Sequence, residues 1–426
     1  RCLNCPKPLC RMGCPIENEI PRFIQAIARG NFGEANDILA ERTNLPSICG
    51  RVCPRENQCE GNCIMNKAKK PPINIGKLER FAADFESINE LRKPKKIKQD
   101  LGKVAVVGSG PAGLSVAGDI AKLGYEVTVF EGQSEPGGVL LFGIPEFRLS
   151  KSVVRREIAR LEGLGVKFVC NTFIGQDKTL DELFAEGFDS IFIGTGTHIP
   201  QEVRMENDEV HGVFQAMYLL TNVQLVDNGE LDEAQIPVKK GDRVIIIGGG
   251  NVAMDAARTC VRLGCESVTV AYRRSQEQMP ALLSEYEEAR AEGVQFQWFA
   301  SPVGVEGKDK VEGFKYEVMA LNEDGAGIHG TGKFQVMPVD KIIIAAGHKP
   351  NARLIGEGNN LKVDEKGYII TSEDPYGMTN RDGVFAGGDV VHKPATVVLA
   401  MREAKKAVDG MVKYMEIKKA QESANQ

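Results

Sequence analysis

Two glycine-rich turns, each directly after an apolar run, constrain the fold of this 426-residue chain more than any other feature. The first is Gly108-Ser109-Gly110-Pro111-Ala112-Gly113, after the run 104–107, and the second is Gly248-Gly249-Gly250-Asn251-Val252-Ala253, after 244–247. Between a strand and a helix, the first glycine of such a turn allows a tight bend. The second lets the backbone approach a pyrophosphate at the helix N-terminus. The sequence therefore predicts two βαβ units, each of which binds a dinucleotide.

The residues after the second strand of each unit differ in charge. In the first unit, the apolar run 127–130 ends in Glu131, whose carboxylate can accept hydrogen bonds from an adenosine ribose. In the second unit, the strand predicted at 267–272 is followed by Arg273 and Arg274. A carboxylate favours a free 2′-hydroxyl, whereas arginine accommodates a 2′-phosphate. We predict that the second nucleotide is NADP(H). The alternative is two surface arginines after an edge strand.

Two further segments end a strand pattern in a glycine-containing turn. Residues 191–197, which include Thr195, are typical of the strand and turn that close the first half of an FAD domain. Residues 342–347 repeat this pattern and end in Ala346 and Gly347, at the end of the second nucleotide unit. These two strand-and-turn patterns indicate an α/β fold of the flavin disulfide-reductase type, in which an NADPH domain is inserted into an FAD domain.

The last strand pattern, at 383–389, runs into Gly388 and Asp389. In enzymes of this type, such an aspartate faces the ribityl chain and pyrophosphate of the flavin; the alternative is an ordinary turn aspartate. A helix that begins near Thr396 and Val397 would direct its N-terminus at the pyrimidine end of the isoalloxazine. The positive end of its dipole would stabilise the negative charge of a reduced flavin.

Eight of the eleven cysteines lie within the first 63 residues, which indicates a metal centre. They form two groups: Cys2, Cys5, Cys10 and Cys14, then Cys49, Cys53, Cys59 and Cys63. Thiolates on short irregular loops are typical of iron–sulfur ligands, and with two neighbouring clusters the last cysteine of one run often binds the other cluster. The spacing favours two [4Fe–4S] clusters. Two zinc sites are an alternative, although zinc prefers paired Cys-x2-Cys motifs and only one occurs. Disulfides would require secretion, which nothing supports.

The remaining patterns divide the chain into segments. Apolar residues at helical spacing within 15–45, broken near Gly30 and Gly33, and within 76–91 predict a small helical domain around the cysteines. The basic stretch 92–98 is expected to be a solvated connector; the alternative is a docking site for an acidic partner. The predicted organisation is a helical domain at 1–92, a linker at 93–102, an FAD domain at 103–235 and 349–426, and an NADPH domain at 236–348.

Charge and hydropathy indicate which partners and which cellular compartment to expect for the protein. The net charge of −5 gives no indication of nucleic-acid binding, and no stretch approaches the ~20 apolar residues of a membrane-spanning helix. Clustered reduced thiols favour the cytoplasm. The sequence begins at Arg1 rather than at Met, so we expect residues to be missing before it, and a targeting segment is only weakly excluded.

Six motifs carry a resemblance to a known family. They are Arg1-Cys2-Leu3 with Cys5, Gly50-Arg51-Val52-Cys53-Pro54, Gln58-Cys59-Glu60-Gly61 with Cys63, Pro72-Ile73-Asn74-Ile75-Gly76-Lys77-Leu78-Glu79-Arg80-Phe81, Gly143-Ile144-Pro145-Glu146-Phe147-Arg148-Leu149 and Tyr272-Arg273-Arg274. The chain resembles the NADPH-oxidising small subunits of bacterial glutamate synthase. It is at least as similar to the large subunits of NADH-dependent reduced ferredoxin:NADP oxidoreductases, and the N-terminal half of dihydropyrimidine dehydrogenase resembles the same module. The motifs extend from residue 1 to residue 274, and the resemblance to about residue 400.

The resemblance implies site residues that spacing alone leaves open. One cluster would take Cys2, Cys5, Cys10 and Cys63, and the other would take Cys14, Cys53, Cys59 and Glu79. From spacing alone, Cys49 would be the eighth ligand, and it remains the alternative to Glu79, which could equally be a solvated helix residue. The resemblance also implies that Gly137, Gly138 and Arg148 contact FAD. Ser150 stands where relatives usually have proline, which puts little in doubt.

The function implied by the resemblance is electron input to a second subunit. Hydride from NADPH would pass to FAD, and single electrons would leave through the clusters, so no acid or base is assigned a catalytic role. The partner would be the glutamate synthase large subunit. The alternative is a small ferredoxin reductase-like flavoprotein in an electron-bifurcating enzyme, with ferredoxin as a further partner. A distant alternative is a zinc-stabilised, nucleotide-sensing scaffold.

Overall fold

The chain forms two compact units. The computed structural model describes all residues except 90–96, 324, 326, 351–359, 394–395 and 425–426, so most of the predicted basic connector at 92–98 lies outside the described residues. The first unit consists of Arg1–Leu141, Glu146–Ile199 and Lys349–Gln426. The second consists of Phe142–Pro145 and Pro200–His348.

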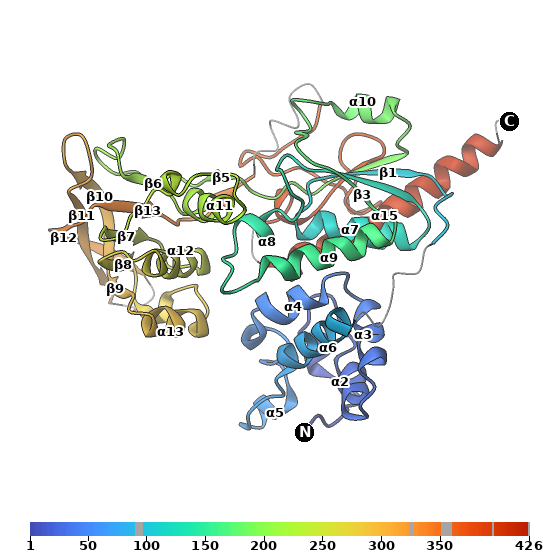
Figure 1. The fold of residues 1–426 in the computed structure, drawn as a ribbon, viewed down its shortest axis with the longest axis horizontal. Helices are drawn as coiled ribbons and strands as arrows, with labels where there is room; N and C mark the ends of the chain where they lie inside the picture. The colour runs from blue at the N-terminus through green and yellow to red at the C-terminus, as the bar shows by residue number, and fades with distance from the viewer. Residues whose placement is uncertain (90–96, 324, 326, 351–359, 394–395, 425–426) are drawn as a thin grey trace. The chain divides into compact units, whose positions relative to one another are not determined.

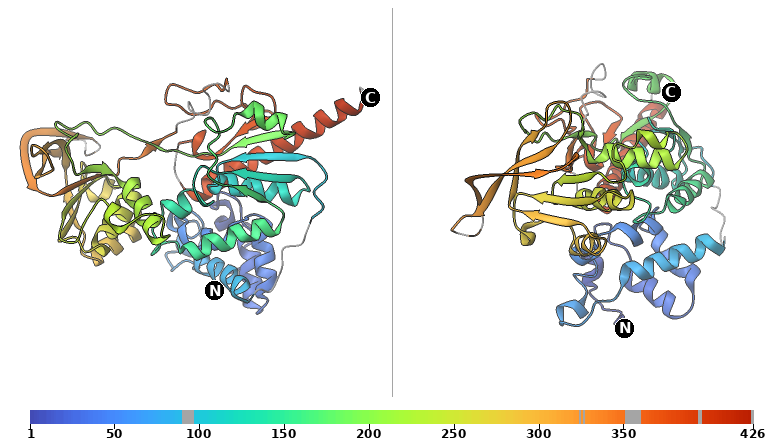
Figure 2. Two further views of the ribbon diagram at one scale, coloured as in Figure 1. Left: turned by 45° about the horizontal axis from the view of Figure 1, so that its top comes forward. Right: turned by 60° about the vertical axis from the view of Figure 1, so that its left-hand side comes forward.

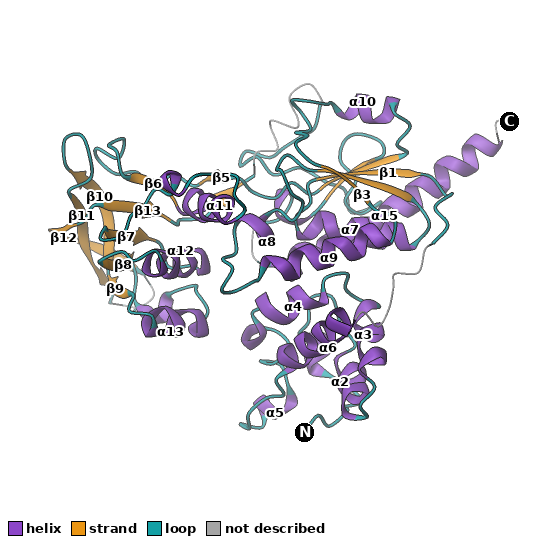
Figure 3. Ribbon diagram, viewed as in Figure 1, coloured by secondary structure: helices purple, strands orange, loops and turns teal. Residues whose placement is uncertain are grey.

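The N-terminal part of the first unit is helical, as Figure 3 shows in purple. Its elements are α1 (Leu9–Met12), α2 (Ile20–Ala28), α3 (Phe32–Ala40), α4 (Pro46–Val52), the 3-10 turn η1 (Arg55–Asn57), α5 (Ile64–Lys67) and α6 (Ile75–Asn89). The predicted break falls at Gly30, whose φ of +76° ends α2, and α3 begins where the side chain of Asn31 accepts a hydrogen bond from the Glu34 N–H. Residues such as Phe23 and Leu39 form a buried core that also contains Cys59 and Cys63.

The rest of the first unit is built on a five-stranded parallel sheet with the strand order β15-β4-β1-β2-β3. The strands are β1 (Lys103–Val107), β2 (Glu126–Phe130), β3 (Lys167–Val169), β4 (Ser190–Ile193) and β15 (Val384–Ala386). The helices are α7 (Pro111–Lys122), α8 (Val139–Phe142), α9 (Lys151–Gly163), α10 (Leu180–Ala185), the turn η4 (Gly388–Val390) and α15 (Val397–Ala424). The central strands β1 and β4 are apolar because helices or loops cover both faces of such a sheet (Figure 1).

Hydrogen bonds join the N-terminal helical part to the helices α7 and α9, which pack on this sheet. The side-chain amide of Asn44 donates to the Ser115 carbonyl at 3.1 Å and to the Asp119 carboxylate at 2.8 Å. The Ser47 N–H donates to Glu157 at 3.1 Å. The Ser47–Glu157 bond joins α4 to α9, which lie next to each other in Figure 1, and α4 also contacts α15. The helical part is therefore a part of the first unit rather than a separately tethered body.

The second unit contains another five-stranded parallel sheet, of order β6-β13-β7-β8-β9, and a three-stranded antiparallel sheet, of order β10-β11-β12. The parallel strands are β6 (Val213–Gln215), β7 (Arg243–Ile247), β8 (Ser267–Tyr272), β9 (Gln295–Trp298) and β13 (Lys341–Ile344). The antiparallel strands are β10 (Ala300–Glu306), β11 (Gly313–Leu321) and β12 (Ile328–Pro338), drawn in orange tones in Figure 2. The helical segments are α11 (Ala216–Asp227), η2 (Glu233–Gln235), α12 (Asn251–Arg262), η3 (Gln276–Gln278) and α13 (Leu283–Ala291).

The architecture confirms the predicted α/β fold with two Rossmann-like units. The short strands β5 (Ile199–Pro200) and β14 (His348–Lys349) pair where the chain leaves and re-enters the first unit. The domain boundaries expected from the sequence, at 102/103, 235/236 and 348/349, stay a prediction. Among the described residues, no helix is both long enough and apolar enough to span a bilayer.

Candidate cofactor sites

The first glycine-rich turn joins β1 to α7 and has no room for side chains at two of its glycines. Gly108 has a φ of +93°, a conformation that favours glycine. A Cβ atom added to Gly113 would lie 1.9 Å from the Gly108 carbonyl oxygen. Gly110 is the residue before the first turn of α7, and a Cβ added there would meet no protein atom within 4 Å. Neighbouring backbone thus packs tightly against Gly113, whereas the space beside Gly110 is free of protein atoms. A phosphate needs such free space to approach the backbone closely.

Glu131 ties three predicted FAD-binding segments together. Its buried carboxylate accepts hydrogen bonds from the N–H of Ser109, at 3.0 Å, from the Ser109 hydroxyl, and from the N–H of Gln133, at 2.9 Å. The Ser109 oxygen in turn accepts from the N–H of Gly137 at 2.8 Å. Next to it, Gly138 lies against Gly110, where an added Cβ would be 3.0 Å from the Gly110 Cα. The structure therefore brings together the turn, the strand end and the Gly137-Gly138 loop, and Ser109 is the link that sequence reasoning missed.

Thr195, Gly388 and Asp389, which are also predicted FAD residues, lie along the same sheet. A Cβ on Gly108 would be 3.1 Å from the Cα of Thr195, and a Cβ on Gly388 would be 2.7 Å from the Cβ of Ala112. Asp389 follows Gly388 in η4, and burial raises the pKa of its carboxyl group to about 6. The end of β4 and the turn η4 thus both lie next to the first glycine-rich turn.

Three predicted FAD residues lie outside these turns. The Thr396 hydroxyl accepts a hydrogen bond from the N–H of Leu399 at 3.3 Å, so Thr396 caps α15, which begins at Val397 as expected. Arg148 is half-buried, in the segment between α8 and α9. Their contacts with FAD stay a prediction.

The second glycine-rich turn repeats this geometry between β7 and α12. Gly248 has a φ of +145°, and an added Cβ would lie 2.4 Å from the Ala345 carbonyl oxygen. Gly250 precedes α12 and again has no protein atom within 4 Å of an added Cβ. The side chain of Asn251 accepts a hydrogen bond from the Leu282 N–H at 2.9 Å, which fixes the first residue of α12. The open position is the same in both units.

The other predicted NADP residues lie either directly after this turn, in α12, or after the neighbouring strand β13. Val252 and Ala253 form the first turn of α12, with Ala253 fully buried. Ala346 and Gly347 follow β13 and are exposed. Because β13 pairs with β7, these two residues lie at the same edge of the sheet as the glycine-rich turn.

Arg273 and Arg274 are exposed where β8 ends. Within the part of the chain that the structure describes, neither guanidinium makes a hydrogen bond or an ion pair. Three other arginines of this unit, Arg243, Arg258 and Arg262, are paired with carboxylates. Two unpaired cations beside a nucleotide-type turn fit a 2′-phosphate.

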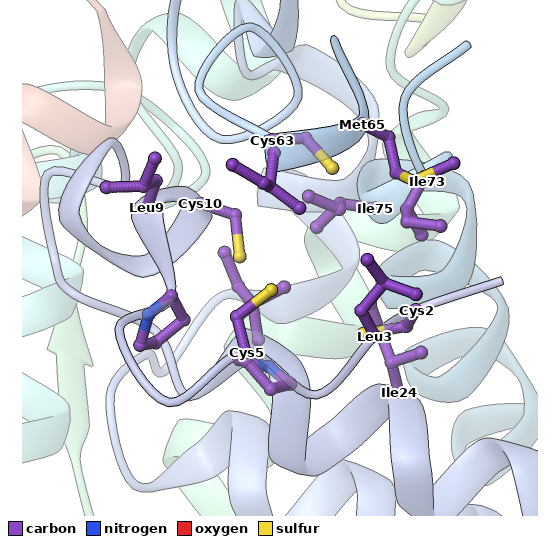
Figure 4. Close-up of a pocket in the computed structure, with 14 residues that line it drawn as sticks. Cys2, Leu3, Cys5, Leu9, Cys10, Ile24, Cys63, Met65, Ile73 and Ile75 are labelled. Atoms are coloured by element: carbon purple, nitrogen blue, oxygen red, sulfur yellow. The ribbon is translucent and has the colours of Figure 1, made fainter. Parts of the chain in front are cut away.

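Four cysteines predicted to hold the first cluster line one cavity. Cys2, Cys5, Cys10 and Cys63 line a small cavity with a volume of about 20 Å³, and the rest of its lining is apolar. In Figure 4 the sulfur atoms of Cys5, Cys10 and Cys63 point into this space. Burial, together with the nearby thiols of Cys63 and Cys2, raises the pKa of Cys10 to about 11. A positive metal centre is what would keep such thiols deprotonated, so the donor set fits an iron–sulfur cluster.

The residues predicted for the second cluster also form a group. Burial raises the pKa of Cys14 to about 12 and raises that of Cys59 further, and the charge of Glu79 contributes to both. The pKa of Cys53 is raised by a hydrogen bond with Cys49, by burial and by the charges of Glu79 and Cys14. These interactions place the three thiols and the Glu79 carboxylate near one another.

Glu79 is buried on α6 and is not the solvated helix residue of the alternative interpretation. Its side chain is 8% exposed, and burial raises its pKa to about 8. The side-chain amide of Asn18 donates to it at 3.2 Å, a contact that no sequence signal predicted. Cys49, the competing ligand, is also buried and lies near Cys53. The choice between Glu79 and Cys49 therefore stays a prediction.

Single-ion sites were also sought. Over the described ranges of the chain, no three histidine, cysteine, aspartate or glutamate side chains gather closely enough to hold one metal ion. A [4Fe–4S] cluster spreads its four protein ligands over four irons, so its ligands need not converge on one point.

Comparison with protein families defines the class of protein. Residues 102–404 match the family described as pyridine nucleotide-disulphide oxidoreductase. Residues 1–91 match dihydropyrimidine dehydrogenase domain II, 4Fe-4S cluster. The class is therefore an oxidoreductase with an N-terminal iron–sulfur domain.

Individual relatives narrow this class. The chain is 37% identical to the glutamate synthase [NADPH] small chain of Escherichia coli K12, across 98% of this chain and 90% of that one. It is 33% identical to the NAD-dependent dihydropyrimidine dehydrogenase subunit PreT of E. coli K12, across 98% and 93%. Among solved structures, FprA from Mycobacterium tuberculosis has a TM-score of 0.62 at 20% identity, across 76% of this chain and 86% of that one, which shows a shared fold. The chain belongs to the glutamate synthase small-chain family of iron–sulfur oxidoreductases.

Proposed function

We propose that this chain accepts hydride from NADPH in its second unit and passes the electrons through FAD and two [4Fe–4S] clusters to a partner subunit, as a glutamate synthase small chain. The observation that carries this proposal is the position of α4. This helix ends directly before Cys53 and packs against α9 and α15 of the FAD-type part. A route from flavin to cluster thus runs within one compact unit.

The residues of the chain bind and orient rather than transfer protons. In the first unit, Gly110 leaves space for the FAD pyrophosphate, and Glu131 receives the ribose. In the second unit, Gly250 has the corresponding space, and Arg273 and Arg274 bind the 2′-phosphate. A bound flavin supplies the conversion of hydride into single electrons, which iron–sulfur clusters carry onward.

Two separate groups of donors support the proposal of two clusters rather than one. The cavity group is Cys2, Cys5, Cys10 and Cys63, and the second group is Cys14, Cys53, Cys59 and Glu79. We propose the domain limits 1–92, 103–235 with 349–426, and 236–348 for the iron–sulfur, FAD and NADPH domains. We propose a cytoplasmic location, which the clustered cysteines support because thiols stay reduced there.

The partner we propose is the glutamate synthase large subunit. The names of the relatives support this assignment, since one is a small chain and another a subunit. A small ferredoxin reductase-like flavoprotein, with ferredoxin as acceptor, is the second candidate. A large glutamate synthase gene beside this one supports the first, and a small ferredoxin reductase-like gene supports the second.

Anaerobic reduction of the purified full-length chain tests the proposed function. We expect flavin absorption bands and a broad iron–sulfur absorption, both of which decrease on addition of NADPH. An electron paramagnetic resonance signal of reduced clusters should develop in the same titration. If the chain purified anaerobically shows neither flavin nor iron–sulfur absorption, the proposed redox function is wrong.

The Arg273→Ala variant should lose preference for NADPH. Removal of one charge-assisted hydrogen bond to the 2′-phosphate is expected to lower kcat/KM for NADPH about 10- to 30-fold, or about 1.4–2 kcal/mol, and to leave NADH nearly unaffected. Flavin reduction by each nucleotide, followed by stopped-flow absorbance, measures this. Lys308→Ala, which removes an exposed cation elsewhere in the second unit, is the control and should change neither value. Equal losses for both nucleotides in Arg273→Ala would contradict the 2′-phosphate role.

A further inference from the structure

We propose that Asn18 positions Glu79 for the second cluster: its side-chain amide holds one carboxylate oxygen of Glu79, so that the other oxygen is directed to the iron. The inference rests on the proposed function, because it requires a cluster that Glu79 binds. It concerns a residue that neither ligand group contains. Asn18 is a positioning residue, because it acts on the iron through Glu79.

The segment that follows Cys14 brings the Asn18 side chain into the protein interior. Glu17 has a φ of +51°, a left-handed conformation that is uncommon for residues other than glycine, and its N–H donates to the Cys14 carbonyl at 2.9 Å. At this turn Glu17 is exposed, whereas Ile16, Asn18 and Ile20 are buried. Backbone strain of this kind is often found at functional sites. Here it occurs between a predicted cluster ligand and a buried amide.

The buried amide of Asn18 bonds directly to Glu79. Transfer of an amide out of water costs free energy unless a hydrogen bond inside the protein compensates for it. Asn18 is 3% exposed, and its Nδ2 donates to Glu79 Oε1 at 3.2 Å. Within the residues that the structure describes, the oxygen Oδ1 of the same amide has no hydrogen-bond partner. The bond to Glu79 is therefore the interaction that a leucine of similar shape could not provide.

This hydrogen bond meets two requirements of a carboxylate ligand. Burial disfavours the charged form of the Glu79 carboxyl group, whereas a donated hydrogen bond favours it. A carboxylate that binds a metal is also commonly hydrogen-bonded to a further group, which fixes its orientation. With Oε1 held by Asn18, Oε2 is the oxygen that faces the iron.

The same bond joins two segments that supply ligands to the second cluster. Asn18 lies four residues after Cys14, and Glu79 lies on α6, 61 residues after Asn18. A displacement of either segment would move the Cys14 thiol relative to the Glu79 carboxylate. The Asn18 side chain restrains this displacement, so its loss should affect the second cluster and not the first.

Iron release from the full-length, anaerobically purified protein to a ferrous-iron chelator tests this inference. Asn18→Leu keeps the approximate shape of the side chain but removes the donor. Loss of a group that orients a metal ligand commonly weakens metal binding about 10- to 100-fold. We therefore expect about half of the iron, that of the second cluster, to be released faster by this factor. The other half, in the first cluster, should keep the wild-type rate and serves as an internal reference.

A matched control is available in the same helical part. Asn36 on α3 is 4% exposed, and among the described residues its Oδ1 also lacks a hydrogen-bond partner. Asn36→Leu therefore removes a buried amide elsewhere, and it should release all of its iron at the wild-type rate. Equally accelerated release from Asn36→Leu would show that loss of any buried amide is sufficient, and would contradict the specific role of Asn18.

A second pair of variants separates hydrogen bonding from packing. Asn18→Asp keeps the shape of the side chain but places a carboxylate next to Glu79, so it should lose the second cluster. The double variant Asn18→Asp with Glu79→Gln reverses the hydrogen bond. The introduced glutamine donates its N–H to the introduced aspartate and retains an oxygen for the iron. The double variant should recover most of the iron that Asn18→Asp loses.

The outcomes distinguish this inference from the proposed function. Wild-type release rates for both halves of the iron in Asn18→Leu, or a full second cluster in Asn18→Asp, would overturn the inference and leave the function intact. If Asn18→Leu does not fold, as judged by circular dichroism, the double variant decides: no recovery of iron relative to Asn18→Asp contradicts the donor role. A wild-type chain without clusters would instead overturn the proposed function, and this inference with it.

Discussion

The Gly110→Ala variant is expected to lose FAD while the FAD-free chain stays folded. A Cβ at Gly110 meets no protein atom within 4 Å, and its φ of −70° suits any residue. The methyl group would instead occupy the space expected for the pyrophosphate, against backbone that cannot move away. We expect FAD affinity to fall at least about 100-fold, or ~3 kcal/mol. Flavin content after purification and fluorescence titration with FAD measure the loss, and circular dichroism follows folding.

The matched control lies at the same position of the other nucleotide unit. Gly250 has a φ of −93° and equally has no protein atom within 4 Å of an added Cβ. Gly250→Ala should therefore retain FAD but be reduced poorly by NADPH. If Gly110→Ala binds FAD normally, the first unit is not the FAD site. If the two variants exchange their effects, the two nucleotides have been assigned to the wrong units.

The Glu79→Ala variant is expected to lose the second cluster and with it about half of the iron. Glu79 is buried beside Cys14, Cys53 and Cys59, and alanine leaves that cluster with three protein ligands. Electron transfer beyond the flavin should then fall by more than about 100-fold, or ~3 kcal/mol of barrier. Iron analysis and reduction of an artificial one-electron acceptor measure both effects. Glu79→Gln keeps an oxygen ligand and should keep most of the iron.

Glu86 provides the control on the same helix. It lies seven residues after Glu79 on α6, and burial raises its pKa as it does that of Glu79. Its other electrostatic neighbours are Arg160 and Glu157, with no cysteine among them. Glu86→Ala should therefore keep all of its iron. Full iron content in Glu79→Ala would show that Glu79 is not a ligand.

The parts of the fold that could be predicted are those specified by neighbouring residues. The strand, glycine turn and helix around Gly108 and Gly248 follow from apolar runs and from glycines in a fixed order. The helix break at Gly30 follows from a single residue with positive φ. Each of these signals lies within a few residues of the structure that it determines.

The antiparallel sheet could not be predicted in the same way. Strand β12 (Ile328–Pro338) is exposed along most of its length, so it shows no alternation of buried and exposed side chains. The seven-residue helix α4 was also missed, because its residues were interpreted as part of a cysteine loop. Short or exposed elements depend on pairing and packing with distant segments, and sequence periodicity does not record these contacts.

The same limit applied to the candidate sites. Residue types and spacing indicated Glu131 and the cysteines, but not the partners that hold them. Ser109 bonds Glu131, which is 22 residues away, and Gly137, which is 28 residues away, and Asn18 donates to Glu79 across 61 residues. Such contacts are set by the tertiary fold, so only the coordinates reveal them.

The two parallel sheets have an evolutionary consequence. The strands β4-β1-β2-β3 in one and β13-β7-β8-β9 in the other occupy equivalent places, with an acidic residue after β2 and two basic residues after β8. One backbone plan thus occurs twice in the chain, and the residues that follow its second strand differ in charge between the two copies. Because the same strand order folds with either charge at that place, we expect point mutations there to change the preferred nucleotide and leave the fold intact.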